Sequence, residues 1–383
     1  MRYELSSLCY YAKGKISIDS LSKRNYISTE NIMPNKGGIV DASNLPSVQY
    51  TQRYVKGDIL VSNIRPYFKK IWMAENDGGC SNDILVFRAM PECDPTFLYY
   101  VLANDAFFDY AMATSKGTKM PRGDKIAIME YEVPCFDHKI QLRIGQLLRS
   151  IDKRITVNKM INDNLYAQAK AIKKQWIAKS KDRYELLPLI EVAAINPDTY
   201  SPKEAWEYVN YLDTSNITDG FIADIQHIVP SSEKLPSRAR RKVAAGDVLF
   251  STVRPNQNHF GIISDPLPNM LASTGFAAIR SKNPLVCNEL IYLCLTEWDF
   301  IEKMQQLAEQ STSTFPSIKP SDLGTCQIPC PKDESSDAFT DTLKSLFALI
   351  AANFRENSSL ATMRETLLPK LMSGEIDVSA GQL

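Results

Sequence analysis

The chain has 383 residues, of which 44% are hydrophobic and 23% are charged, and its formal net charge is zero. This composition is typical of a globular protein with two or three domains. It argues against a protein that holds a polyanion by bulk positive charge, and no stretch approaches the roughly 18 consecutive apolar residues of a membrane span.

The N-terminus has no apolar h-region of a signal peptide. We therefore expect a cytoplasmic protein that does not bind or span a membrane. The eight cysteines form no CxxC pair and are expected to be reduced thiols. Net charge is uneven: it is +1 for residues 1–136, +8 for 137–181, −7 for 182–335 and −2 for 336–383. Nucleic-acid binding would therefore need local basic patches or a basic partner.

Residues 1–136 are predicted to form the first domain, a mixed module. Its β-rich runs at 58–64 and 84–88 are broken by Gly, Pro and Asn, and one helix is expected near 95–112.

A long helix is predicted over 137–181, because apolar side chains alternate at spacings of four and three, as in a heptad seam. The seam positions are Ile144, Leu148, Ile151, Ile155, Asn158, Asn162, Leu165, Ala169, Ile172 and Trp176.

Residues 182–335 repeat the plan of the first module, with strands near 248–253 and 276–280 and a helix near 288–307. A second long helix is predicted over 336–377, followed by a tail at 378–383. Each of its seam positions lies 195 residues after its counterpart, so Asn353 and Asn357 correspond to Asn158 and Asn162.

The clearest sign of duplication is the run GDILVSNIRP at 57–66, which returns as GDVLFSTVRP at 246–255. The offset of 189 residues, about half the chain, indicates two modules and not a short-period solenoid. We predict an α+β fold: two similar mixed α/β domains separated by two long helices, which pair as an antiparallel coiled coil with pseudo-twofold symmetry.

The seam asparagines have two interpretations. A buried Asn penalises registers in which its amide lacks a partner, so Asn158, Asn162, Asn353 and Asn357 would fix the register of the pair. Alternatively, a drift of one residue turns them toward solvent. Helices of some 40 residues would be about 60 Å long and could hold two modules at a fixed distance.

Arg65 and Arg254 follow the repeated strands, and each precedes a proline that ends its strand. A guanidinium at such a strand exit can bind a phosphate or fork onto guanine. The alternative is a salt bridge or a structural brace.

The residues after these arginines differ between the copies. The first copy continues as Tyr67-Phe68-Lys69-Lys70, whereas the second continues as Asn256-Gln257-Asn258-His259, a run rich in side-chain amides that can pair with adenine. A polar turn is the alternative. Two related modules that share a scaffold but carry different side chains after the repeated strand could each recognise a different target.

Three further polar segments are candidate DNA contacts. Ordinary solvated loops and charges are the alternative for each. They contribute Lys116, Thr118, Lys119 and Arg122 from 115–122, then Arg238, Arg240 and Arg241, and then Ser311, Thr312, Ser313 and Thr314 from 310–317.

Catalytic and metal-binding patterns are missing: the sequence has no P-loop, no GxGxxG after a strand and no HExxH. The three histidines lie far apart, and Asn196-Pro197-Asp198 lacks the second proline and aromatic residue of an amino-methyltransferase motif. We therefore expect no catalytic residue and no metal site.

Along its whole length the chain resembles the specificity (S) subunit of type I restriction-modification systems. The GD-strand-RP runs and GCSNDILVFR at 79–88 resemble its target recognition domains, and LLRSID at 147–152 and LLPKLMSGEI at 367–376 resemble its spacer helices. Order, duplication and spacing together carry the resemblance.

The resemblance implies that each recognition domain reads half of a split site in double-stranded DNA, while the helices set the gap. It also implies partners: methyltransferase (M) subunits, two of them, which use S-adenosylmethionine for adenine methylation, and restriction (R) subunits, which use ATP and Mg. This chain would carry no cofactor and no catalytic centre.

Two other classes stay open. The chain could be a self-sufficient DNA methyltransferase or nuclease with a cryptic site, or a scaffold whose modules bind proteins.

Overall fold

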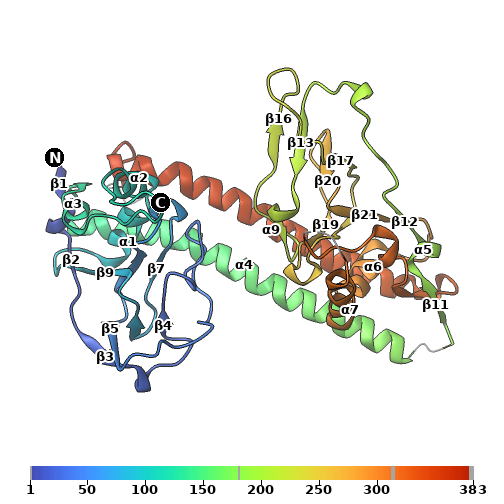
Figure 1. The fold of residues 1–383 in the computed structure, drawn as a ribbon, viewed down its shortest axis with the longest axis horizontal. Helices are drawn as coiled ribbons and strands as arrows, with labels where there is room; N and C mark the ends of the chain where they lie inside the picture. The colour runs from blue at the N-terminus through green and yellow to red at the C-terminus, as the bar shows by residue number, and fades with distance from the viewer. Residues whose placement is uncertain (1, 180–181, 312–314, 379–383) are drawn as a thin grey trace. The chain divides into compact units, whose positions relative to one another are not determined.

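The computed structural model describes residues 2–179, 182–311 and 315–378 (Figure 1). Its contacts define two compact units: Met1–Thr156 with Asn357–Leu383 is unit 1, and Val157–Glu356 is unit 2. The long helices α4 (His138–Lys179) and α9 (Asp337–Ser373) are each divided between the two units, after Thr156 and after Glu356.

Unit 1 contains two four-stranded sheets, in the orders β2-β9-β6-β7 and β3-β5-β8-β4, and a short pair β1-β10. All neighbours are antiparallel except the parallel pair β4 and β8. The strands are β1 (Arg2–Glu4), β2 (Cys9–Tyr11), β3 (Lys15–Ser17), β4 (Tyr26–Ile27), β5 (Tyr50–Tyr54), β6 (Ile59–Ser62), β7 (Ile71–Met73), β8 (Gly78–Cys80), β9 (Ile84–Ala89) and β10 (Glu132–Pro134). The helices are α1 (Pro95–Ala103), α2 (Asp105–Ala113) and α3 (Lys125–Met129).

Unit 2 repeats this plan, with sheets β12-β21-β18-β19 and β16-β13-β20-β17, the closing pair β11-β22 and an extra hairpin β14-β15. Its one parallel pair among the described strands is β13 with β20, as β4 is with β8 in unit 1. The strands are β11 (Tyr184–Pro188), β12 (Ala193–Ile195), β13 (Val209–Leu212), β14 (Ile217–Thr218), β15 (Phe221–Ile222), β16 (Gln226–Ile228), β17 (Ala239–Lys242), β18 (Asp247–Ser251), β19 (Phe260–Ile263), β20 (Met270–Ser273), β21 (Phe276–Ser281) and β22 (Gln327–Pro331). The helices are α5 (Leu189–Val192), α6 (Asn288–Leu295), α7 (Trp298–Glu309) and α8 (Pro320–Leu323).

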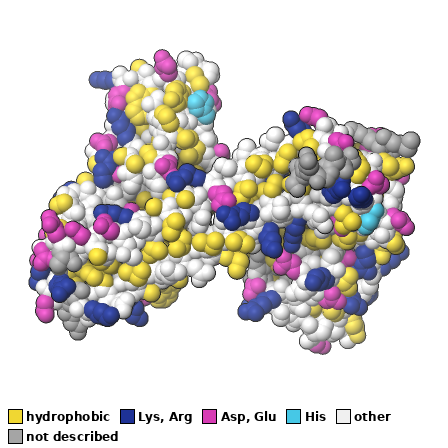
Figure 2. All heavy atoms as spheres, turned by 180° about the vertical axis from the view of Figure 1, so that it is seen from behind, with side chains coloured by type: hydrophobic (Ala, Val, Ile, Leu, Met, Phe, Trp, Pro, Cys, Tyr) yellow, Lys and Arg dark blue, Asp and Glu magenta, His cyan; other side chains and the backbone are white. Residues whose placement is uncertain are grey.

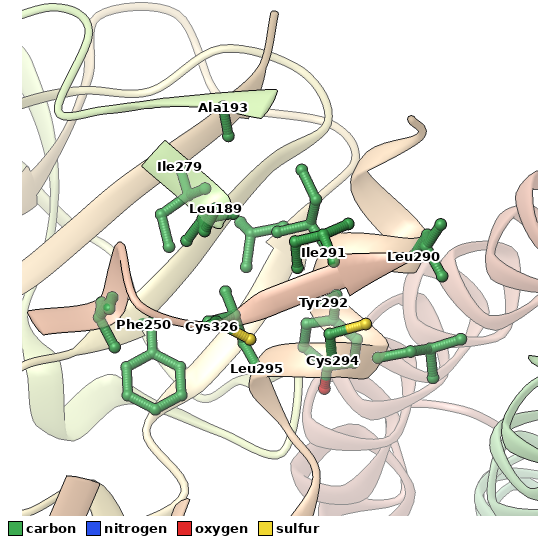
Figure 3. Packing of buried hydrophobic residues seen from close by; sticks show 14 of the residues in the cluster. Leu189, Ala193, Phe250, Ile279, Leu290, Ile291, Tyr292, Cys294, Leu295 and Cys326 are labelled. Atoms are coloured by element: carbon green, nitrogen blue, oxygen red, sulfur yellow. The ribbon is translucent and has the colours of Figure 1, made fainter. Parts of the chain in front are cut away.

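The repeated strands β6 and β18 lie inside their sheets and are buried along their whole length, which explains their continuous apolar runs. Figure 3 shows how Phe250 of β18 and Ile279 of β21 lie near α6 in the core of unit 2. That core also includes Ala169 of α4 and Phe347 of α9. Each module is thus built onto the part of the helix pair that belongs to its unit.

Each module closes with a short antiparallel pair just before a long helix. In unit 1, Arg2 lies opposite Pro134, and in unit 2, Tyr184 lies opposite Pro331. The entry and exit of each module are therefore adjacent. The domain bounds themselves stay a prediction.

The single helices expected near 95–112 and 288–307 were wrong, because each is two helices. The first breaks at Asn104, whose backbone is extended and whose side chain accepts a hydrogen bond from the Ala106 amide at 3.1 Å. An Asn that caps a new helix outweighs a continuous apolar pattern. The second pair breaks between α6 and α7, at Thr296 and Glu297.

The Asp of each GD turn forms a buried ion pair. Asp58 accepts two hydrogen bonds from the Arg88 guanidinium, both at 2.7 Å, and Asp247 accepts two from Arg280 at 2.7 and 2.9 Å. The preceding glycines have φ of 90° and 84°, a conformation that favours glycine. The hydrogen bonds to the carboxylates raise the pKa of both arginines.

Replacing this buried carboxylate should destabilise the module. Asp58→Asn keeps the shape but leaves the Arg88 fork without its counter-charge, and we expect a loss of about 2 kcal/mol in the free energy of unfolding of unit 1. Urea unfolding measures it. Asp41→Asn is the matched control, because the Asp41–Arg24 pair is exposed and should contribute less than about 0.5 kcal/mol. Equal losses in the two variants would contradict a structural role for the buried pair.

The two long helices run antiparallel within each unit, as predicted. In unit 1, Arg364 of α9 forms an ion pair with Asp152 of α4 at 2.7 Å, and in unit 2, Trp176 stacks on Phe339 with ring centroids 4.3 Å apart. The polar contact in unit 1 is extended by the Tyr100 hydroxyl, which donates to Asp152 at 2.5 Å. Burial alone would lower the pKa of Arg364, but the Asp152 carboxylate raises it.

Three of the seam asparagines, Asn158, Asn162 and Asn353, lie at the contact between α4 and α9 within unit 2. Asn353 donates to Asn162 at 2.7 Å, and Asn158 donates to the Glu356 carboxylate at 2.8 Å. Asn158, Asn162 and Asn357 are buried, and Asn353 is half-buried. Within the described residues, no helix is both long and apolar enough to cross a membrane.

Candidate nucleic-acid interface

The strand exits have the same unusual backbone in both copies. Arg65 and Arg254 adopt left-handed conformations, with φ of 52° and 48°, and each is followed by a 3₁₀ turn, at Pro66–Phe68 or Pro255–Gln257. A second left-handed residue, Lys69 or Asn258, ends the turn. Left-handed residues other than Gly cost free energy and persist where the surroundings fix them, often at functional sites.

A second segment lies directly beside each strand exit. The Arg65 amide donates to the Pro121 carbonyl at 2.8 Å, and the Arg254 amide donates to the Pro316 carbonyl at 2.9 Å. We call residues 65–70 with 115–122 the first tip, and residues 254–259 with the described part of 310–317 the second tip. The structure therefore brings together two segments that the sequence singled out separately, in each copy.

Several cations of the first tip have partners within the module. Lys69 forms an ion pair with Asp105 at 2.8 Å, Lys116 with Asp124 at 2.5 Å and Arg122 with Asp83 at 3.0 Å. Burial raises the pKa of the Asp105 carboxyl, but hydrogen bonds from Lys36 and Lys69 outweigh it and hold that pKa below its usual value.

Lys70 contacts the module through its ammonium, which donates to the Thr29 carbonyl at 2.6 Å, and burial lowers its pKa. By contrast, Arg65 and Lys119 have no carboxylate partner within the described part of the chain, and the Arg65 Nε is buried without a hydrogen-bond partner there. Thr118 and Lys119 are exposed. Arg65 and Lys119 are thus the cations of this tip whose charge is not neutralised internally.

The second tip presents amides. Asn256 and Gln257 are exposed, whereas Asn258 and His259 are half-buried, and the His259 imidazole lies 2.7 Å from the Ile217 carbonyl. The Arg254 guanidinium lies over the Phe315 ring at 5.0 Å, a cation–π contact, and forms no ion pair in the portion described. Of the predicted hydroxyl residues, Ser311 is half-buried, and Thr312, Ser313 and Thr314 lie outside the described residues.

The basic cluster of the second module lies on another sheet, at β17. Arg238 is exposed, Arg240 donates to the Ser237 carbonyl at 3.2 Å, and burial lowers the pKa of Arg241. Arg240 and Arg241 belong to the sheet β16-β13-β20-β17, whereas the second tip follows β18 of the sheet β12-β21-β18-β19. The arginines of the cluster stay predicted contacts, separate from the second tip.

Met120 and Phe315 were not singled out from the sequence, but the structure places both in the tips. Both are exposed, and each stands just before the proline that accepts a hydrogen bond from the strand-exit arginine. An apolar residue at the same position of two polar loops was the available signal. A search for charged and polar DNA contacts does not select such an apolar residue.

On the face shown in Figure 2, basic and acidic side chains are interspersed and do not form a large patch of one charge. In the described part of the chain, no group of three His, Cys, Asp or Glu side chains is arranged to hold a metal ion. The chemistry that the tips offer is hydrogen bonding, apolar contact and local positive charge.

No family model matches the chain. Curated relatives include the specificity subunits of the type I restriction enzymes HindI from Haemophilus influenzae, 23% identical over 163 residues, and EcoDI from Escherichia coli, 30% identical over 152 residues. These matches cover 43% and 39% of this chain but only 35% and 32% of the relatives. The MjaVIII specificity subunit from Methanocaldococcus jannaschii is 24% identical over 307 residues, which cover 74% of this chain and 71% of that protein.

A solved structure of a type I restriction-modification S subunit from M. genitalium is similar over 99% of this chain and 96% of its own, with a TM-score of 0.56 and 18% identity. It confirms the predicted fold class of two mixed modules and two long helices. The chain is therefore similar in sequence to type I restriction enzyme specificity subunits and has the fold of a solved S subunit.

Proposed function

We propose that the chain is the DNA-recognition subunit of a type I restriction-modification complex and reads a bipartite site, one half with each tip. One observation carries the proposal: two copies of the same strained turn and neighbouring loop present different side chains at equivalent positions. Tyr67 and Phe68 stand in the first copy where Asn256 and Gln257 stand in the second. A shared frame with different contacting groups is what two different half-sites require.

The relatives support this function because they are named specificity subunits. We further propose that α4 and α9 fix the gap between the half-sites, and that two M subunits and the R subunits assemble with this chain. S-adenosylmethionine would act in the M subunit and ATP and Mg in the R subunit, so the chain itself would be non-catalytic.

A methyl-transfer assay tests whether catalysis belongs to the M subunit and not to this chain. The purified chain is incubated with duplex DNA and S-adenosylmethionine, alone and with its M subunit. We expect adenine methylation only in the mixture. Methylation by the chain alone would establish a self-sufficient methyltransferase, and a mixture that binds scrambled and genomic duplexes equally well would favour a protein-binding scaffold.

The strand-exit arginines should carry affinity for one half-site each. Arg254→Gln removes a guanidinium with no internal carboxylate partner among the described residues, and we expect about 5- to 150-fold weaker binding, a cost of about 1–3 kcal/mol. Arg65→Gln should act likewise through the other half. Electrophoretic mobility shifts with duplexes altered in one half-site measure both effects.

Arg24→Gln is the control for these variants, because Arg24 is exposed on unit 1 outside both tips. A loss at Arg24 as large as at Arg65 and Arg254 would mean that the arginines act only by general charge.

A further inference from the structure

We propose that the first tip reads its half-site by apolar contact with thymine 5-methyl groups in the major groove, whereas the second tip reads its half-site with amides. This inference rests on the proposed function and adds the chemistry by which each half is read. The contacting groups of the first tip are Tyr67, Phe68 and Met120.

These three side chains are apolar and yet exposed. Tyr67 is 49% exposed, Phe68 38% and Met120 49%, and the rings of Tyr67 and Phe68 lie 4.6 Å apart at an interplanar angle of 51°. The hydrogen bond from the Arg65 amide to the Pro121 carbonyl keeps the loop with Met120 beside the turn with the two rings. Tyr67, Phe68 and Met120 are therefore exposed apolar side chains on two adjoining segments of one tip, and we call these three the apolar surface.

This surface is held in place before any ligand binds. Left-handed residues, Arg65 and Lys69, enclose the turn, and the ion pair of Lys69 with Asp105 ties its end to α2. The Lys70 ammonium lies 5.9 Å from the centre of the Phe68 ring. Aromatic groups fixed in advance lose little conformational entropy on binding, so their contact area contributes to affinity and specificity.

The surroundings of the apolar surface suit DNA. Lys119 is exposed on the same tip and has no carboxylate partner among the described residues, so its positive charge can approach phosphates. The ion pairs of Lys116 and Arg122 with single carboxylates leave guanidinium and ammonium donors available at the surface. An apolar centre with a basic rim matches a groove floor between two phosphate backbones.

The shape favours the groove floor over insertion between base pairs. Two rings tilted by 51° with centroids 4.6 Å apart are thicker than the rise of about 3.4 Å per base pair. A major groove about 12 Å wide admits such a surface, and thymine is the base that presents a methyl group there. The second tip offers instead the exposed amides of Asn256 and Gln257, which match the donor and acceptor of adenine.

The test uses the full chain in complex with its methyltransferase subunit. Selection from random duplexes gives the bipartite site, and the Tyr67→Ala/Phe68→Ala variant identifies the half-site of the first tip as the half that it relaxes. Deoxyuridine then replaces each thymine of that half-site, which removes only the methyl group. We expect about three- to fourfold weaker binding of the wild type per contacted methyl.

The same uracil substitutions should leave the affinity of the Tyr67→Ala/Phe68→Ala variant unchanged, because the methyl contact is already gone. Tyr67→Phe keeps the apolar surface and should respond like the wild type. Normal binding of the second half-site shows that the alanine variant is folded, and Asn256→Ala/Gln257→Ala should relax only that half.

The outcomes separate the inference from the function on which it rests. No selected sequence at all would overturn the proposed function. A bipartite site whose first half lacks thymine, or whose thymines can all be replaced by uracil at no cost in wild-type affinity, would overturn the apolar reading and leave the function standing.

Discussion

Exchanging residues 182–335 for the equivalent module of another specificity subunit is expected to change one half of the recognised site and leave the other half intact. The physical basis is that the ends of this module meet at the β11–β22 pair, where Tyr184 lies opposite Pro331. The exchange therefore interrupts the fold at one place. Retaining both long helices preserves the gap, and selection from random duplexes reads out both halves.

The donor module must keep the apolar side chains that face the helices. In this chain the core of unit 2 includes Ala169, Phe339, Leu343 and Phe347 from α4 and α9, so a donor with a similar core should fold. The reciprocal exchange of residues 1–136 is the control and should change the opposite half. A hybrid in which both halves change would contradict independent reading by two modules.

Inserting one heptad into each long helix should lengthen the gap between the half-sites and leave their sequences unchanged. Seven helical residues add about 10 Å, or about three base pairs. The insertions belong after Thr156 and Glu356, at the boundary between the units. Seven residues keep the seam in phase, so the apolar and asparagine positions still meet.

An insertion in only one helix is the control, because the Asn162–Asn353 contact of unit 2 and the Asp152–Arg364 contact of unit 1 could then no longer both stay in register. That variant should be less stable and should not bind a site with a longer gap. If the double insertion bound only the original gap, the helices would not determine the spacing.

Most of the architecture could be predicted because the sequence contains two copies of the same pattern. The recurrence of the GD-strand-RP run fixed the position of β6 and β18, and the seam spacing fixed α4 and α9. The break at Asn104 could not be seen in the same way. An Asn inside an apolar run looks like a tolerated polar residue until its backbone is known to be extended and its side chain to cap the next helix.

The segments that make up the two candidate tips could be singled out from the sequence, but the contacts inside them could not. Lys69, Lys116 and Arg122 form ion pairs with carboxylates that lie from 8 to 39 residues away in the chain, and spacing alone does not predict such pairs. The left-handed conformation of Arg65 is also invisible in the sequence, because non-glycine residues adopt it only when tertiary contacts impose it. The side chains that differ between the copies, in contrast, could be read directly.

The most direct test of the central claim is sequencing of methylated adenines in the host genome, with and without the gene for this chain. We predict that one motif loses methylation when the gene is absent, and that this motif has two defined half-sites separated by a gap of fixed length and unspecified sequence. An unchanged methylation pattern, or the loss of one continuous motif without a gap, would contradict recognition of a bipartite site by this chain.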